Sequence, residues 1–199
     1  CSKDGKLFVF HDLNLSRLVG INRFFYDCTY EELKNFPLGR TFMRRFSNLR
    51  IPPIEEFMDW VQLNPIPINI ELKESLLKHP DELITWLIDL ELPLGSHFSS
   101  FYDELLQIVK QVRPEFETAI IVTKLFYWDA LESLHHIDAI HANKKYYKSR
   151  YLTTASAAKK HMRFYGIEGN ESFLKNPHPI VKGWITDYPL KLVTFLGRK

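Results

Sequence analysis

IPINIELK, residues 66–73, is the stretch that decides the fold class of this 199-residue chain. Its isoleucines alternate with other residues, so Ile66, Ile68 and Ile70 share one face of an extended segment. Further β-favouring segments follow, each separated from the next by a helical pattern: residues 96–101, 118–122, 138–142, 162–167 and 183–187. Strict alternation of this kind is typical of a parallel sheet with helical crossovers. The sequence therefore predicts six βα units in a single α/β domain over residues 1–199.

Two helices are expected before that stretch. Thr29 is followed three residues later by Glu32, the spacing of a capping box, which predicts a helix start. Pro53 suits the first position of a second helix. The apolar residues after it recur with amphipathic-helix spacing: Ile54, Phe57, Met58 and Val61.

The first apolar run, Leu7–Phe10, needs a different interpretation. KDG at residues 3–5 is a tight-turn signal directly before it, and parallel neighbours cannot be joined by so short a turn. We expect the run to be the second arm of a hairpin whose first arm lies upstream. Half a hairpin and six βα units indicate a (β/α)8 TIM barrel lacking its first two strands, since such barrels typically take ~250 residues. The alternative, an open doubly wound sheet, calls for a glycine-rich turn that the sequence lacks.

Composition narrows the class of protein. Lys and Arg number 26 against 24 Asp and Glu, a net charge of +2, which gives no field for nonspecific binding to nucleic acid. The two cysteines, Cys1 and Cys28, are too few for a disulfide framework and fit a reducing compartment. No run approaches the ~18 apolar residues that a membrane span needs. We therefore expect a cytoplasmic protein without a transmembrane segment, and the start at Cys1 predicts a piece of a longer chain.

Polar residues at the carboxyl ends of the strands are the candidates for chemistry, because active sites of α/β barrels lie there. The candidates are His11, Asp12, Glu71, Lys73, Thr186 and Asp187. A carboxylate can hold Mg²⁺ or Ca²⁺, a lysine can balance phosphate charge, and an imidazole can transfer a proton. The set suits phosphate-ester chemistry. The alternatives are a hydrogen-bonded structural histidine and a surface ion pair of glutamate with lysine.

Several motifs carry a resemblance to a known family. They are, in order, KDGKLFVFHDLNLSRLVG, TYEELKNF, IPPIEEFMDW, INIELK, SSFYDELL and WITDYP. In this order and spacing they resemble the glycerophosphodiester phosphodiesterase family, from Lys3 to about Pro189. The resemblance implies a (β/α)8 barrel that hydrolyses glycerophosphodiesters to an alcohol and glycerol 3-phosphate. It also implies a bound divalent cation, Mg²⁺ or Ca²⁺.

The resemblance also assigns roles to residues. His11 matches the second of two catalytic histidines, Glu71 the metal-binding glutamate, and Lys73 the lysine that faces the phosphate. Phe101 matches the phenylalanine of a Ser-Phe motif and is a candidate for the substrate pocket, with core packing as the alternative. Tyr165 lies where the family usually has a tryptophan-containing strand, and we expect it to form the aromatic wall against glycerol.

Arg17 and Gly20 also fall within the family pattern and are expected to shape the loop after the histidine. In other places the sequence departs from that pattern. The H-R-G motif with the first catalytic histidine and the E-x-D metal pair are absent. We therefore expect the 199 residues alone to be inactive and poorly stable, because an open barrel leaves unpaired strand edges. The active species would be the longer parent chain.

Two other functions and the oligomeric state remain open at this stage. One alternative is a non-catalytic barrel that binds phosphodiesters. The other is a phospholipase D-like lyase acting on lipid headgroups, which exposed apolar loops around the barrel mouth would favour. The expected partner is a small-molecule glycerophosphodiester, and the sequence does not distinguish a monomer from a homodimer.

Overall fold

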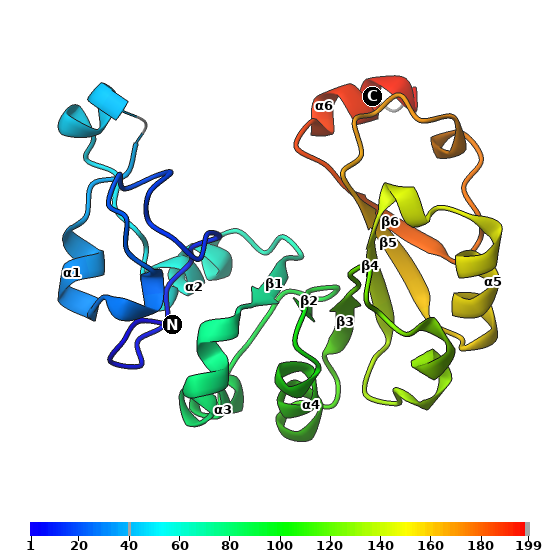
Figure 1. Ribbon diagram of the computed structural model, residues 1–199, viewed down its shortest axis with the longest axis horizontal. Coiled ribbons are helices and arrows are strands. Elements are labelled where there is room, and N and C mark those ends of the chain that lie inside the picture. The colour runs from blue at the N-terminus through cyan, green and yellow to red at the C-terminus, as the bar shows by residue number, and fades with distance from the viewer. Residues whose placement is uncertain (40, 198–199) are drawn as a thin grey trace. The chain divides into compact units, whose positions relative to one another are not determined.

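A computed structural model describes residues 1–39 and 41–197 of the chain (Figure 1). The described chain forms two compact units. One unit comprises Cys1–Ile68 and Lys73–Ser96, and the other comprises Asn69–Leu72 and His97–Lys199. The assignment of residues 1–199 to one barrel domain stays a prediction.

The second unit is built on a parallel sheet. Within the described residues the sheet has six strands: β1 Asn69–Leu72, β2 His97–Ser100, β3 Glu117–Ile121, β4 Ala139–Asn143, β5 His161–Tyr165 and β6 Val181–Ile185. Each strand pairs in parallel with the next in the sequence, and Figure 1 shows them in that order. The predicted α/β class and parallel strand order are therefore confirmed, and the complete barrel with two missing strands stays a prediction.

Helices cross between these strands. They are α4 Asp103–Val112 and α5 Ser149–Ala157, with the 3-10 helices η4 Trp128–Ser133, η5 Lys144–Tyr146 and η6 Ser172–Leu174, and a further helix, α6 Pro189–Phe195, follows β6. The helix α4 buries Leu105, Leu106 and Val109 and packs against β2 and β3. The crossover from β5 to β6 contains only η6, because glycines and prolines in residues 166–179 cannot continue an α-helix.

The sheet has an apolar face and a polar face, because alternate residues of a strand point to opposite sides. Phe98, Ile140 and Phe164 are completely buried on the apolar face. On the polar face, small alanines let longer side chains meet across the strand between them. The rings of His97 and His141 lie 5.2 Å apart across β3, which carries Ala119 there.

The polar face also contains an ion-pair network. Glu117 of β3 reaches past Ala139 of β4 to β5, where one carboxylate oxygen lies 3.0 Å from His161 Nε2. The other carboxylate oxygen accepts a hydrogen bond of 2.5 Å from Arg163 Nη1. These contacts tie β3 to β5 on the polar face of the sheet.

The first unit is helical. Its helices are α1 Tyr30–Asn35, α2 Ile54–Leu63 and α3 Pro80–Ile88, with the 3-10 helices η1 Phe25–Asp27, η2 Thr41–Phe46 and η3 Glu74–Lys78. The capping box predicted for α1 is present, since the Thr29 side chain accepts from the Glu32 N–H and the Glu32 carboxylate accepts from the Thr29 N–H. The helix predicted after Pro53 is also confirmed, as α2. Among the described residues, no helix has the length and apolar character needed to cross a membrane.

The run Leu7–Phe10 is not a strand within the described residues, and its pairing with an upstream hairpin arm stays a prediction. Phe8 forms an isolated antiparallel bridge with Pro53, the Val9 N–H donates to Pro52 O, and the Ile54 N–H donates to Leu7 O. The pairing cannot extend, because its partner segment contains two consecutive prolines without N–H groups. The turn expected at residues 3–5 does form, with Gly5 at a φ of 80°.

Replacing Thr29 with alanine should lower the free energy of unfolding by about 1 kcal/mol, because two N–H groups at the start of α1 depend on the capping box. Urea denaturation followed by circular dichroism measures the change. Thr29→Ser keeps the hydroxyl and should unfold at nearly the wild-type urea concentration. An alanine variant as stable as the wild type would contradict a stabilising role for this cap.

Candidate functional site

The carboxyl ends of the strands bring two predicted site residues together in the second unit. Glu71 is the third residue of β1, and Tyr165 is the last residue of β5. Burial raises the pKa of Tyr165, and the nearby Tyr146 and Glu71 raise it further. The Glu71 carboxylate therefore lies within electrostatic reach of the Tyr165 phenol.

A pocket of about 370 Å³ opens beside Tyr165. Its lining comes from the ends of β5 and β6 and the loops that follow them: Tyr165, Gly166, Ile167, Glu168, Ile185, Thr186, Asp187 and Tyr188. The Thr186 hydroxyl donates to Ile167 O at 2.5 Å and accepts from the Tyr188 N–H at 3.0 Å. These bonds tie the two loops together, so the pocket is already formed in the structure. Asp187, a sequence candidate, lines it.

The loop after β5 is held by Glu171. The Glu171 carboxylate accepts hydrogen bonds from the backbone N–H groups of Glu168, Gly169 and Asn170. It also pairs with Lys144 at 2.9 Å. Burial alone would raise the pKa of Glu171, but these N–H groups and the ammonium lower that pKa to about 2. Glu171 therefore remains ionised at neutral pH and fixes one side of the pocket.

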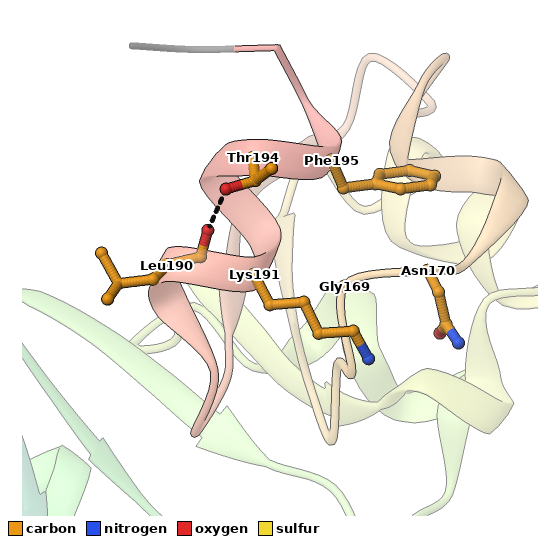
Figure 2. A pocket seen from close by; sticks show the side chains of 6 residues that line it. All are labelled: Gly169, Asn170, Leu190, Lys191, Thr194 and Phe195. Atoms are coloured by element: carbon orange, nitrogen blue, oxygen red, sulfur yellow. Dashed lines mark hydrogen bonds between the residues drawn. The ribbon is translucent and has the colours of Figure 1, made fainter.

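Another pocket, of about 430 Å³, lies between this loop and α6 (Figure 2). Gly169 and Asn170 line one side, and Leu190 and Phe195 lie on the helix side. A Cβ on Gly169 would stand 3.1 Å from the backbone of Leu192, so the close approach of loop and helix depends on this glycine. None of the predicted site residues lines this pocket.

Lys73 and Phe101 both follow strands directly. Lys73 has extended backbone angles after β1 and is half-buried. Phe101 comes after β2, and its side chain is 46% exposed, which disfavours core packing. Their places match the sequence expectation, and their roles in phosphate and substrate binding stay predictions.

His11 lies in the first unit and forms a relay with two neighbours. Its Nδ1 is 3.0 Å from Asp12 Oδ1, and Asp12 accepts two bonds from the Arg17 guanidinium, of 2.6 Å and 3.0 Å. Arg17, and to a smaller extent His11, lower the pKa of Asp12 to about 2 against an opposing effect of burial. An ionised carboxylate can only accept, so Nδ1 carries the hydrogen and Nε2 can exchange a proton.

The pairing of Asp12 with Arg17 could not be read from the sequence. Arg17 was expected to shape the loop, and the structure instead shows it holding the carboxylate that orients His11. The spacing of five residues within an irregular loop belongs to no helical or strand period. One chemical indication of this pairing is present in the sequence, since an acidic residue, Asp12, and a basic residue, Arg17, stand close to His11.

The described residues do not supply a complete cation site. Among residues 1–39 and 41–197, no three His, Cys, Asp or Glu side chains are grouped so that they could hold a metal ion. Glu71 would therefore be one ligand of a larger set. Its role toward a cation stays a prediction.

The structure defines an α/β protein with a six-stranded parallel sheet and a pocket at the carboxyl ends of β5 and β6. Residues 1–191 match the model of the glycerophosphoryl diester phosphodiesterase family, and the chain belongs to this family. The resemblance found in the sequence is thereby confirmed.

Curated relatives agree with the family. Over 124 residues the chain is 32% identical to a glycerophosphodiester phosphodiesterase of Bacillus altitudinis, an alignment covering 60% of this chain and 51% of that protein. Over 123 residues it is 28% identical to a glycerophosphodiester phosphodiesterase of Caldanaerobacter subterraneus, covering 60% of this chain and 51% of the relative. The chain thus spans about half the length of the curated relatives it matches.

Solved structures share the fold. A phosphodiesterase of Oleispira antarctica, solved with the product sn-glycerol-3-phosphate, matches with a TM-score of 0.77 at 23% identity, over 98% of this chain and 81% of that one. A putative glycerophosphoryl diester phosphodiesterase of Agrobacterium tumefaciens gives a TM-score of 0.77 at 16% identity, over 98% and 82% of the two chains. At these identities the likeness establishes the fold.

Proposed function

We propose that the protein hydrolyses small-molecule glycerophosphodiesters to an alcohol and glycerol 3-phosphate. The family match over residues 1–191 is the observation that carries this reaction class. A relative of 32% identity bears the name of this activity, and a structural neighbour was solved with its product. A strand-end pocket of about 370 Å³ is in the size range of small-molecule sites.

His11 would be the acid–base group. Its Nε2 would take a proton from the attacking oxygen or give one to the leaving alcohol oxygen, while Asp12 keeps the ring oriented through Nδ1. Arg17 keeps Asp12 ionised and would preserve that orientation over the neutral pH range. Asp12 and Arg17 are therefore positioning residues in this proposal.

The remaining residues would bind the substrate and a divalent cation, Mg²⁺ or Ca²⁺. Glu71 would contribute a carboxylate oxygen, the ligand type that both ions prefer. Lys73 would face the phosphate, and its ammonium would balance negative charge there. Phe101 and Tyr165 would contact the glycerol part, supported by the position of Tyr165 in the pocket wall.

Replacing Glu71 with glutamine should raise the cation concentration needed for half-maximal activity by about 10- to 100-fold, because the neutral amide is a weaker ligand for a hard cation. Glycerol 3-phosphate release by the complete protein, titrated with Mg²⁺ or Ca²⁺ after treatment with a chelator, measures this. Glu91→Gln, at an exposed position, is the matched control and should titrate like the wild type. An unchanged cation requirement in the Glu71 variant would remove Glu71 from the ligand set.

Glycerol 3-phosphate release, together with calorimetry and phosphorus NMR, distinguishes the two alternative functions from hydrolysis. A non-catalytic barrel would bind the phosphodiester in calorimetry and release no alcohol. A phospholipase D-like lyase would release the alcohol and leave a cyclic phosphate, which phosphorus NMR distinguishes from glycerol 3-phosphate.

We also propose a cytoplasmic location, supported by the two free cysteines among the described residues, Cys1 and Cys28, which fit a reducing compartment.

A further inference from the structure

Residues 38–39 and 41–50 of the first unit belong to a loop, called here the 38–50 loop, that contains the helix η2 (Figure 1). The Leu38 N–H donates to Leu49 O at 2.9 Å and joins the two ends. The Gly39 N–H donates to Leu18 O, also at 2.9 Å, and ties the loop to the rest of the unit. The 38–50 loop is therefore a preformed structure of the compact-loop type that often carries function.

Arg44 anchors the 38–50 loop. Its Nε donates to Leu18 O at 3.2 Å and to Gly39 O at 3.1 Å. The guanidinium lies against Gly20, which has a φ of 79° and where a Cβ would overlap the guanidinium atoms. The absence of a side chain at Gly20 therefore makes room for the anchor of the 38–50 loop.

The 38–50 loop exposes apolar side chains. Phe42 is 64% exposed, Phe46 72% and Leu49 70%, and the two phenylalanine rings lie edge to face with centroids 5.3 Å apart. The hydrophobic core of the unit is formed by other residues: Leu15, Val19, Phe25, Cys28, Leu33 and Ile51. Because exposed apolar surface of this kind is unfavourable in water, clustering it on a fixed loop marks a contact surface.

The 38–50 loop is also strongly basic. Its sequence contains no acidic residue and has arginines at four positions: Arg40, Arg44, Arg45 and Arg50. This is a high local charge in a chain whose net charge is only +2. Arg50 is exposed, and its Nη1 donates to Ser47 O and Leu49 O at 3.0 Å each, which places the guanidinium beside the exposed Leu49.

We propose that the 38–50 loop docks on the surface of an anionic lipid bilayer. Phe42, Phe46 and Leu49 enter the boundary between headgroups and acyl chains, and the exposed Arg50 contacts lipid phosphates. Apolar side chains beside basic ones are the pattern that such a surface accepts, since the bilayer offers a layer of anionic groups over an apolar interior.

Other anionic partners fit this surface less well. A nucleic-acid site needs a basic field along a groove, and the net charge of +2 does not provide one. A stable protein partner usually needs about 20–30 residues on each side, more than this loop supplies. The other basic and aromatic run is at residues 144–148. There Tyr146 is buried and Lys144 pairs with Glu168 and Glu171, so these two side chains already have partners within the chain.

Co-sedimentation with lipid vesicles tests this proposal on the full chain, independently of hydrolysis. The wild type is expected to sediment with phosphatidylcholine vesicles containing about one third phosphatidylglycerol, and not with phosphatidylcholine alone. The double variant Phe42→Ser/Phe46→Ser should lower the partition coefficient by at least about tenfold, because two apolar side chains no longer enter the bilayer. Arg50→Gln should lower it about fivefold.

Matched variants elsewhere keep the test specific. Leu94→Ser and Lys124→Gln remove an exposed leucine and an exposed lysine outside the loop and should bind as the wild type does. All variants should retain the wild-type circular dichroism spectrum, since the replaced side chains are exposed. Failure of the wild type to bind anionic vesicles would overturn the proposal. So would unchanged binding by the phenylalanine double variant, or displacement by duplex DNA at equal phosphate concentration.

Discussion

Replacing His11 with asparagine is expected to lower the rate of glycerol 3-phosphate release by the complete protein about 10²- to 10⁴-fold, the usual contribution of an acid–base group. Asparagine cannot exchange a proton at the position of Nε2. The imidazole side chain is 78% exposed, so its removal takes no packing from the core. The loss should appear in kcat, and denaturation curves of the variant and the wild type should coincide.

The reason for so large an effect is the orientation of the ring. Asp12 accepts from His11 Nδ1 and is itself held by two bonds from Arg17. With the pKa of Asp12 lowered to about 2 by Arg17, the carboxylate is ionised throughout the working pH range of an imidazole. The proton expected to move is therefore the one at Nε2.

Two further variants separate chemistry from structure. Asp12→Asn leaves the imidazole in place and weakens its orientation, so a loss of about 10- to 100-fold is expected, smaller than that of His11→Asn. His135→Asn changes an exposed histidine outside the site and should leave the rate unchanged. If His11→Asn retained activity within a factor of two of the wild type, another group would have to transfer the proton.

The sequence predicted the sheet well, because its signals are local. Short apolar runs between turn and helix signals give the strands β1 to β6 directly, and the capping box at Thr29 fixes the start of α1. Leu7–Phe10 forms only an isolated bridge among the described residues, because its partner there lies about 45 residues further along the chain and contains Pro52 and Pro53. Strand propensity in one segment does not reveal what the partner segment can donate.

The site was predictable at strand ends and unpredictable in loops. Glu71 and Tyr165 follow from their places at the ends of β1 and β5. The hydrogen bonds of Glu171 to three consecutive N–H groups depend on the path of the loop, which no periodicity describes. The burial of His141 on the polar face likewise depends on side chains of neighbouring strands, such as His97.

Lowering the pH from about 6.5 to about 5 is expected to destabilise the second unit by about 2 kcal/mol through His141 alone. The residue is 1% exposed, and among the described residues its Nε2 has no hydrogen-bond partner. Burial, and to a smaller extent the neighbouring His97, Arg163 and His161, lower the pKa of His141 to about 3 against an opposing effect of Glu117. The unfolded chain gains a proton near pH 6.5 that the folded chain accepts only near pH 3.

The sign follows from this difference. Because the folded pKa is depressed, the unfolded state binds more protons between these two values, and stability falls as the pH falls. The slope for one histidine is about 1.4 kcal/mol per pH unit. Glu117, whose pKa is lowered to about 2 by His161 and Arg163 against the effect of burial, adds acid sensitivity only below its unfolded value of 4.5. Measurements above about pH 5 therefore exclude Glu117, and the difference from His141→Asn separates His141 from the N-terminal amino group of Cys1, whose pKa burial lowers to about 5.

Urea denaturation at several pH values in this window tests the prediction. His141→Asn carries a constant cost from the substitution, but its stability should depend on pH less steeply than that of the wild type, by about 1.4 kcal/mol per pH unit. His135→Asn, at an exposed position, should keep the wild-type slope. Equal slopes for the wild type and His141→Asn would mean that His141 is protonated in the folded protein, and that Glu117 stabilises the added charge across the polar face.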